Sequence, residues 1–270
     1  MTTTGISLMD HVRAAGFPYL SDIVHVFVGG SELHGAKLDG TDDHDIYGVF
    51  VEPPEIALGL DGCEHFVWST SGNEQRNTAD DVDITLYSLR KWAKLAAKGN
   101  PTCLHFMFAE NQSPHTLHKY VWSNLTHAKE SFLAKSHISQ FIGFVDAQLG
   151  RLTGERGKGK KGQRPELETR FGYDTKAGMH SIRLLYEAIE LMRIGSMTFP
   201  RPEKELLISI RQGAWSLDKL IAEANLLIHE AKKASEESKL PDEVDRKCVS
   251  EIVTEAYCEA WGWDYRKPKR

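Results

Sequence analysis

Two short runs near the start of the chain have the residue types and spacing that bind metal ions and phosphates. Asp43 and Asp45 stand two residues apart at the start of an apolar segment, and alternate side chains of an extended chain point to the same side. The pair can therefore share a divalent cation. Because two Mg²⁺ ions need several protein oxygens, we expect a third carboxylate on an adjacent strand. Asp83 is our choice, with Asp81 as the alternative on the same face.

The second run is the glycine turn Gly29-Gly30-Ser31, which precedes the acidic pair. Glycines let the backbone approach a triphosphate closely, and the start of a following helix offers free N–H groups. Ser31 could add a hydroxyl donor. With two Mg²⁺ or Mn²⁺ ions at the acids, these parts suit in-line attack by a hydroxyl on the α-phosphate of an NTP. Either motif alone is more often an ordinary solvated turn, so the prediction depends on their combined order.

The surrounding pattern predicts elements that would hold these residues. Ile23–Val28 is β-branched and aromatic and stops at the glycines, as a buried strand should. A short helix, capped by Ser31, is expected after the turn. Asp45–Val51 is expected as a second strand and Val82–Leu86 as a third, with Asp83 facing away from the apolar side chains.

The rest of the chain favours helices, because apolar residues recur near the 3.6-residue period. The fold class indicated is α+β, a small mixed β-sheet domain at residues 1–130 followed by a helical domain at residues 131–270. The expected helices are one from Leu89 onward, His115–Val121, Lys135–Leu149, Thr175–Gly195, Pro202–Arg211, Ser216–Ser235 and Asp242–Trp261.

Composition sets bounds but selects no function. A hydrophobic fraction of 41% and a charged fraction of 26% are usual for globular proteins. The four cysteines form no CxxC pair, so reduced thiols are the default interpretation. No run is long and apolar enough for a signal peptide or membrane span, and we expect a cytoplasmic protein without a membrane partner. The pattern does not indicate an oligomeric state.

The net charge of −5 gives no overall attraction to nucleic acid, so such contact would need a local basic cluster. The segment RLTGERGKGKKGQR provides one, and its glycines would keep it mobile. Binding of an RNA backbone and a solvated loop are equally good interpretations of it. Its basic residues are Arg151, Arg156, Lys158, Lys160, Lys161 and Arg164.

The glycine turn followed by D-x-D on a strand resembles the signature of the DNA polymerase β superfamily of nucleotidyltransferases. Longer stretches narrow the resemblance to predicted nucleotidyltransferases of bacteria and phages that are associated with RNA repair and RNA ligase. These stretches lie between Val26 and Leu220 and read GTDDHDIYGVFVEPPE, DVDITLYSLRKWAKLAAKGNPTCLHFMF, YDTKAGMHSIRLLYEAIELMRIG and RPEKELLISIRQGAWSLDKL.

The resemblance implies a polymerase β-like palm and assigns roles by position. Gly29, Gly30 and Ser31 would contact the nucleotide phosphates, and Asp43, Asp45 and Asp83 would bind the metal ions. Lys176 and His180 share one face of a helix with Arg183. Without the resemblance, this face is as well interpreted as a solvated polar stripe. With the resemblance, we favour contact of Lys176 and His180 with a triphosphate or RNA. The chain departs from the family pattern at one place. The family usually has an acidic residue after the segment Asn100-Pro101-Thr102, near His105, and this chain has none there.

Three functions follow as alternatives. The first is transfer of a nucleoside monophosphate from an NTP to an RNA 3′ end, such as that of a damaged tRNA. The second keeps this chemistry but transfers to a protein or small-molecule hydroxyl. The third is a non-catalytic RNA-binding protein, against which the intact acids argue. The base preference and the biological pathway are not indicated.

Overall fold

A computed structural model describes residues 7–38, 43–71, 81–110, 119–155 and 164–265. The contacts between residues divide the chain into two compact units. The first unit comprises Met1–Ala97, Cys103–Phe132 and Val244–Arg270, and the second comprises Lys98–Thr102 and Leu133–Glu243. Each unit is described separately below.

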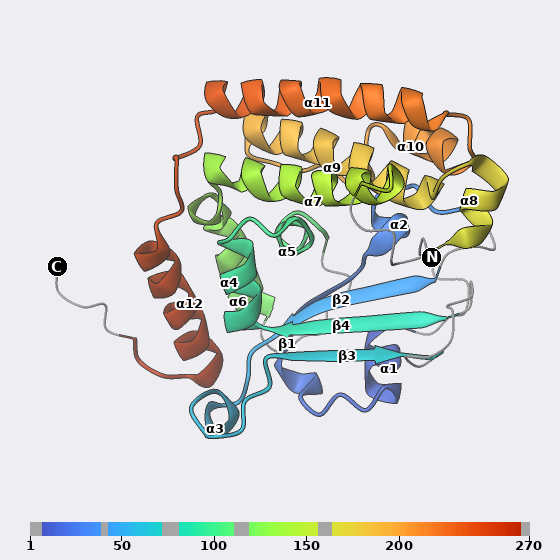
Figure 1. The fold of residues 1–270 in the computed structure, drawn as a ribbon. Helices are drawn as coiled ribbons and strands as arrows, with labels where there is room; N and C mark the ends of the chain where they lie inside the picture. Colours follow the sequence, from blue (N-terminus) through green and yellow to red (C-terminus); the bar gives the residue numbers. More distant parts are fainter. Residues whose placement is uncertain (1–6, 39–42, 72–80, 111–118, 156–163, 266–270) are drawn as a thin grey trace. The chain divides into compact units, whose positions relative to one another are not determined.

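The first unit contains a four-stranded mixed sheet in the order β1-β2-β4-β3 (Figure 1). β2 pairs in parallel with β4, whereas β1–β2 and β3–β4 are antiparallel. The mixed sheet and the many helices confirm the predicted α+β class. The strands are β1 (Ile23–Val28), β2 (His44–Phe50), β3 (His65–Ser69) and β4 (Val82–Ser88).

The two faces of this sheet differ in character. Ile46 of β2 and Ile84 of β4 lie in an apolar core with Leu8 and Val12 of α1 (Leu8–Ala14). Side chains alternate along a strand, so Asp45 and Asp83 of the same strands lie on the opposite face. Aromatic packing continues along that face, where Phe106 contacts the rings of Tyr47 and Tyr87. The sheet thus presents the acids on one face while burying apolar side chains on the other.

Helices complete the first unit. Ser88 ends β4 and caps α4 by accepting a hydrogen bond from the Lys91 N–H at 3.2 Å. The last helix, α12, is joined to the sheet region by the Tyr257 hydroxyl, which donates to the carboxylate of Glu52. These helices are α2 (Gly30–Leu33), α3 (Pro54–Ala57), α4 (Leu89–Ala96), α6 (Lys119–His127) and α12 (Arg246–Trp261), with short 3₁₀ turns η1 (Leu20–Asp22) and η2 (Lys129–Phe132); α5 (Pro101–His105) begins in the second unit and ends in the first.

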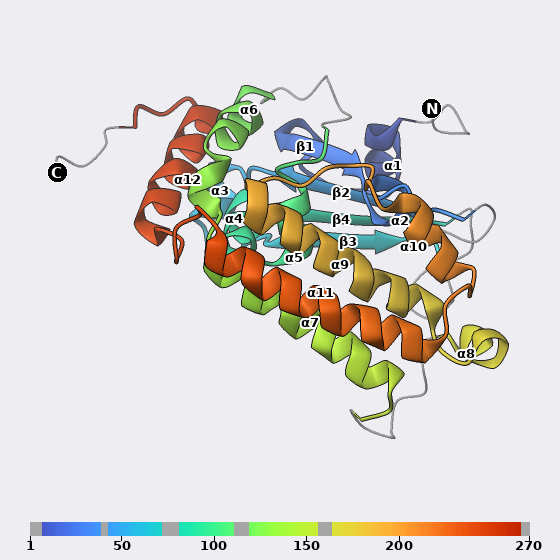
Figure 2. The ribbon, with the colours of Figure 1, turned by 90° about the horizontal axis from the view of Figure 1, so that it is seen from above.

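The second unit is helical, and its long helices α7, α9 and α11 lie side by side, with α9 packed against both of the others and against α10 (Figure 2). Buried residues along α9 include Ile182, Leu185 and Leu191. Within the described ranges, no helix is long and apolar enough to cross a membrane. The elements of this unit are η3 (Lys135–His137), α7 (Ile138–Leu152), α8 (Pro165–Phe171), α9 (Thr175–Ile194), α10 (Lys204–Arg211) and α11 (Leu217–Glu237).

The observed elements differ from the predicted ones in several places. The helix after the glycine turn is only one turn long, its N-cap is Gly29, and Ser31 lies buried inside it rather than capping it. β3 and α8 were not predicted. Part of the helix expected at His115–Val121 lies outside the described residues. We predicted 131–270 as one domain, whereas the contacts group Val244–Arg270 with the sheet.

Candidate metal and nucleotide site

The three acids chosen from the sequence lie together at the start of two neighbouring strands. Asp45 and Asp83 are directly paired across the parallel β2–β4 ladder, and Asp43 precedes β2 by one residue. One carboxylate oxygen from each of the three lies within 4.8 Å of the others. All three residues are partly exposed, while the Oδ1 atom of Asp83 is buried. Carboxylate oxygens grouped in this way are the ligands that Mg²⁺ and Mn²⁺ prefer.

The glycine turn contacts this cluster directly. The Gly29 N–H donates to the Asp45 carbonyl oxygen at 2.7 Å. Gly30 has a φ of +54°, and a Cβ added there would lie 1.8 Å from Asp45 Oδ2. Only glycine fits this position, because it lacks the Cβ and tolerates positive φ. A Cβ on Gly29 would likewise lie 2.2 Å from the Tyr47 ring, so β2 packs closely against both glycines.

Side chains that the sequence pattern did not single out lie next to the acids. His44 stands between Asp43 and Asp45 in the chain, and its Nδ1 is 3.5 Å from Glu32 Oε2. Lys37 Nζ lies 3.0 Å from the same Glu32 oxygen and 3.5 Å from His44 Nδ1. His44 is seven residues from Lys37 and twelve from Glu32 in the sequence, and no strand or helix pattern in the sequence links the three. Only the fold could reveal that they lie together.

Asp81, the alternative third acid, is engaged elsewhere. The Thr70 hydroxyl donates to its carboxylate at 2.5 Å, and the His44 N–H donates to its carbonyl oxygen at 2.8 Å. Asp81 is not in the group of three carboxylates. The geometry therefore favours Asp83 over Asp81 as the third member of the cluster.

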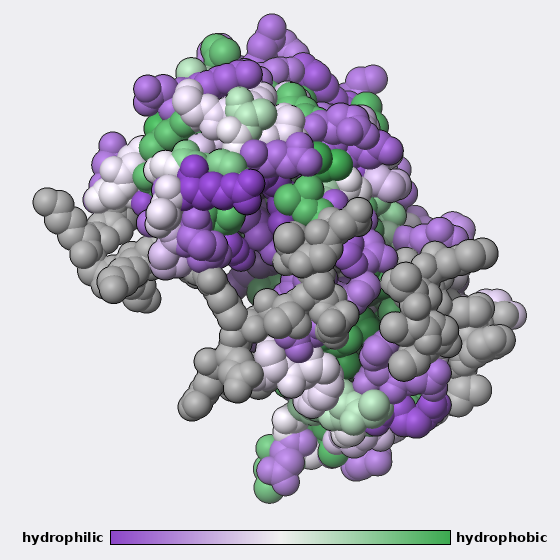
Figure 3. Space-filling model, turned by 90° about the vertical axis from the view of Figure 1, so that its right-hand side faces the viewer, coloured by the Kyte–Doolittle hydropathy of each residue, from purple (hydrophilic) through white to green (hydrophobic). Residues whose placement is uncertain are grey.

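The face of the molecule at the end of the sheet where β2 and β4 begin is mainly hydrophilic (Figure 3). Small hydrophobic areas interrupt the polar surface. A polar surface at this end of the sheet is compatible with a charged substrate.

In the second unit, Lys176 and His180 lie one turn apart near the start of α9. Arg183 donates through Nη2 to His180 Nδ1 at 3.3 Å and through Nη1 to Glu187 at 3.0 Å. Burial, together with the charges of Arg183, Lys176, Arg164 and Arg211, lowers the pKa of His180 well below its usual range. Burial and these neighbouring cations therefore disfavour the protonated form of His180.

The basic segment is only partly described. Arg151 is exposed in the last turn of α7. Arg164 stands at the N-cap of α8, and its Nη1 donates at 3.1 Å to Asp174, the residue whose side chain caps α9. The remaining residues chosen from this segment, Arg156, Lys158, Lys160 and Lys161, lie outside the described residues.

The position where the resemblance expected an acid carries a buried histidine. The rings of His105 and His34 are 5.0 Å apart in an edge-to-face arrangement, and both residues are buried in the first unit. The histidine at this position thus contacts another imidazole, beside the helix that follows the glycine turn.

A cluster of three carboxylates on paired strands, in contact with a glycine turn, is the arrangement that we expected of a nucleotidyltransferase. A family model agrees with this class. The model of the RNA repair pathway DNA polymerase beta family matches residues 6–256. The chain therefore belongs to this family of polymerase β-like nucleotidyltransferases.

Two individual proteins are more distantly similar. An uncharacterized 38.9 kDa protein from the nrdC-mobD intergenic region of Enterobacteria phage T4 is 29% identical over 126 residues. That alignment covers 45% of this chain and only 36% of the phage protein. A crystal structure of a nucleotidyltransferase-like protein from Exiguobacterium sibiricum 255-15 is 12% identical, with a TM-score of 0.30, over 84% of this chain and 72% of its own.

Proposed function

We propose that this protein transfers a nucleoside monophosphate from an NTP to the 3′ hydroxyl of an RNA, with Mg²⁺ or Mn²⁺ held by Asp43, Asp45 and Asp83. The observation that carries the proposal is the convergence of these three carboxylates beside the Gly30 turn. Membership of a family described by RNA repair supports the choice of RNA as acceptor.

The donor set fits divalent cations. Three carboxylates within 4.8 Å of one another concentrate negative charge at one place, and a hard cation offsets it while using oxygen ligands. Two such ions, when bound, would help deprotonate the attacking hydroxyl and neutralise the phosphates. Asp45 and Asp83 sit on paired strands, so their spacing is fixed by the β2–β4 ladder.

The remaining roles fall to the glycine turn and the second unit. Gly29, Gly30 and Ser31 would hold the triphosphate close to the acids, because no side chain separates the Gly30 backbone from the Asp45 carboxylate. Lys176, with neutral His180 beside it, would supply positive charge and a hydrogen bond to phosphates of the NTP or RNA. The basic segment, including Arg151 and Arg164, would contact the RNA backbone.

The test is a transfer assay with α-labelled NTPs, Mg²⁺ or Mn²⁺, and pooled RNA. We expect labelled, extended RNA. Asp45→Asn and Asp83→Asn should each reduce the rate by about 100-fold or more, because each removes a charged ligand of the metal. The matched control is Asp81→Asn, which removes a carboxylate directly before β4 but outside the cluster. This variant should keep most of the activity.

The products separate the possible failures. Label on protein or on a small molecule would overturn the RNA acceptor but keep the chemistry. Absence of any labelled product with either metal, from a protein that still binds RNA, would overturn catalysis altogether. Loss of activity in Asp81→Asn but not in Asp83→Asn would show that the third ligand was chosen wrongly.

A further inference from the structure

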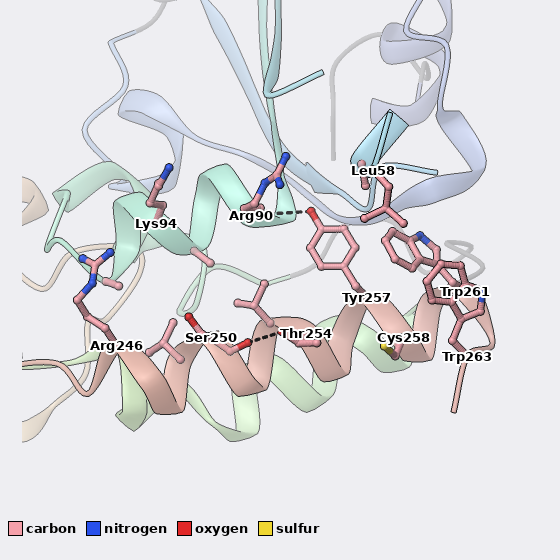
Figure 4. Close-up of a pocket in the computed structure, with 15 residues that line it drawn as sticks. Leu58, Arg90, Lys94, Arg246, Ser250, Thr254, Tyr257, Cys258, Trp261 and Trp263 are labelled. Carbon is pink, nitrogen blue, oxygen red and sulfur yellow. Dashed lines mark hydrogen bonds between the residues drawn. The ribbon is translucent and has the colours of Figure 1, made fainter. Parts of the chain in front are cut away.

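A cavity lies in the first unit between α4 and α12, and the segment after α3 closes one end of it (Figure 4). Its volume is about 500 Å³, which falls within the range of about 300–1,000 Å³ that small-molecule sites occupy. The three acids of the candidate metal site do not line it. Asp83 stands at the start of β4, whereas α4 begins directly after the other end of that strand. The cavity is therefore a separate feature of the first unit.

Small side chains leave this space open. Ala93 and Ala97 lie one turn apart on the face of α4 that lines the cavity, and Val249 and Val253 lie one turn apart on the facing side of α12. Protein interiors are normally packed with few holes larger than a water molecule, so a hollow of this size between two helices is unusual. Ala93 and Val249 are themselves buried. The cavity thus reaches below the surface and is not a shallow patch on it.

Aromatic rings form one end of the cavity. Trp261 and Trp263 lie there next to Leu58 (Figure 4). The centroid of the Trp261 ring is 4.7 Å from that of Trp263 and 5.0 Å from that of Tyr257. Leu58 is 69% exposed and Trp263 is 49% exposed. Large apolar side chains are left in contact with water at a concave surface, as they are at ligand-binding grooves.

Polar groups of the wall are already bonded within the protein. The Tyr257 hydroxyl accepts from the Arg90 N–H at 3.1 Å and donates to the Glu52 carboxylate. Trp261 Nε1 donates to the Glu52 carbonyl oxygen at 3.0 Å, and the Thr254 hydroxyl donates to a carbonyl oxygen of its own helix at 2.7 Å. These groups therefore offer little to a polar ligand. The bonds to Tyr257 and Trp261 also join α4, α12 and the segment after β2, so the cavity keeps its shape without a ligand.

Two of the three cations beside the cavity direct their charges elsewhere. Arg90 and Lys94 contribute to the lining, but their charged ends point away from the cavity (Figure 4). The Lys91 ammonium, 2.9 Å from Glu64, is the main cause of the lowered pKa of that carboxyl, and the charges of Lys94 and Arg90 add to it. The third cation, Arg246, is exposed. A ligand can therefore contact the aliphatic parts of these side chains while their charges stay in water.

We infer that this cavity binds an uncharged, mainly apolar small molecule, held between Ala93 and Val253 with one end against Trp261. A charged or strongly polar ligand would lose its bonds to water and find few partners in a wall whose polar groups are already bonded. An uncharged apolar ligand instead removes both its own surface and the apolar wall from water. A flat protein surface would not fill a space that reaches down to buried Val249. The inference does not rest on the proposed nucleotide transfer.

The test uses N-phenyl-1-naphthylamine, an uncharged aromatic probe whose fluorescence rises in apolar surroundings, titrated into the folded full-length protein. We expect one saturable site whose affinity does not fall when salt is added, because no charge pair forms. Leu58→Ala should weaken binding by about fivefold, because it removes apolar contact area. Leu60→Ala is the matched control, since Leu60 is exposed in the same segment and does not line the cavity. It should bind the probe as the unmodified protein does.

A second pair of variants blocks the cavity. Thr254→Trp, at an exposed lining position, should fill the space and abolish saturable binding. Lys247→Trp, at an exposed position of the same helix outside the lining, should not. Equal affinities of Leu58→Ala and Leu60→Ala would overturn the site, as would saturable binding that survives in a folded Thr254→Trp protein. Failure of RNA extension in the transfer assay would leave these results unchanged, so the two proposals fail separately.

Competition identifies the kind of apolar molecule. Displacement of the probe by indole would assign a planar aromatic ligand, and displacement by decanol would assign an aliphatic chain. Displacement by neither would overturn the inference, and displacement by an amphipathic peptide alone would assign the cavity to a protein partner instead. Tighter binding of an anionic dye than of the uncharged probe, with an affinity that falls as salt is added, would overturn the uncharged class of ligand.

Discussion

Replacing Gly30 with alanine tests whether the glycine turn and the acidic cluster form one site. The added Cβ would lie 1.8 Å from Asp45 Oδ2, whereas real Cβ atoms essentially never approach closer than 3.0 Å. The carboxylate oxygen must therefore retreat by about 1.2 Å, the difference between these distances. Metal–ligand distances tolerate only about 0.2 Å, so a shift of this size should remove Asp45 from the ligand set.

The expected magnitudes follow from two separate effects. An L-residue at a φ of +54° costs about 1–2 kcal/mol of folding free energy. Misplacement of a catalytic group by about 1 Å costs about 100-fold in rate. We therefore expect Gly30→Ala to unfold at a lower denaturant concentration, to bind Mn²⁺ at least about tenfold more weakly, and to transfer nucleotide about 100-fold more slowly. Urea unfolding, Mn²⁺ titration and the transfer assay measure the three quantities.

Gly16 offers a matched control in the same unit. Its φ is +78°, and an added Cβ would meet nothing within 4 Å. Gly16→Ala should show the cost of positive φ without the loss of metal binding or activity. If Gly30→Ala and Gly16→Ala bind Mn²⁺ equally well and turn over equally fast, the contact between the turn and Asp45 has no functional role and the reasoning is refuted.

Two further predictions concern the first unit. Burial lowers the pKa of His25 from 6.5 to about 3, so the folded state resists protonation. The contribution of His25 to the free energy of unfolding is fully present above pH 6.5 and is lost as the pH falls toward 3. The free energy of unfolding should therefore decrease by about 2 kcal/mol between pH 7 and pH 5. The variant His25→Phe, which can keep the ring stack on Trp122, should lose this pH dependence. An unchanged pH dependence in His25→Phe would refute the assignment to His25. Tyr257→Phe should destabilise the chain by about 1–3 kcal/mol in urea unfolding, because buried Glu52 loses a donor, and wild-type stability would contradict that role.

The strands that carry the glycine turn and the acids could be predicted, because the sequence patterns that mark them are local. Ile23–Val28 forms β1 with the bounds that its β-branched run indicated. The alternation at Val82–Leu86 correctly predicted a strand with Asp83 on its polar face, and β4 extends only two residues further. We expected Asp83 on a strand adjacent to that of Asp45, but the parallel register that pairs the two residues directly comes from the structure.

Other features depend on contacts that no local pattern encodes. β3 (His65–Ser69) is a short edge strand with Val67 64% exposed, so it lacks the alternation that marks a half-buried strand. The periodicity of α12 predicted a helix but could not indicate which core it joins. That choice depends on the bond between Tyr257 and Glu52, which are 205 residues apart. The left-handed conformation of Gly30 against Asp45 is likewise visible only in the fold.

The central claim is that Asp43, Asp45 and Asp83 hold the metal ions, and Mn²⁺ titration followed by electron paramagnetic resonance tests it most directly. The unmodified protein should bind Mn²⁺ with NTP present, and Asp83→Asn should weaken that binding by at least about tenfold, since it removes one charged oxygen ligand. Asp81→Asn, whose carboxylate is bonded to Thr70, should bind Mn²⁺ normally. Undiminished Mn²⁺ binding by a folded Asp83→Asn protein would contradict the account.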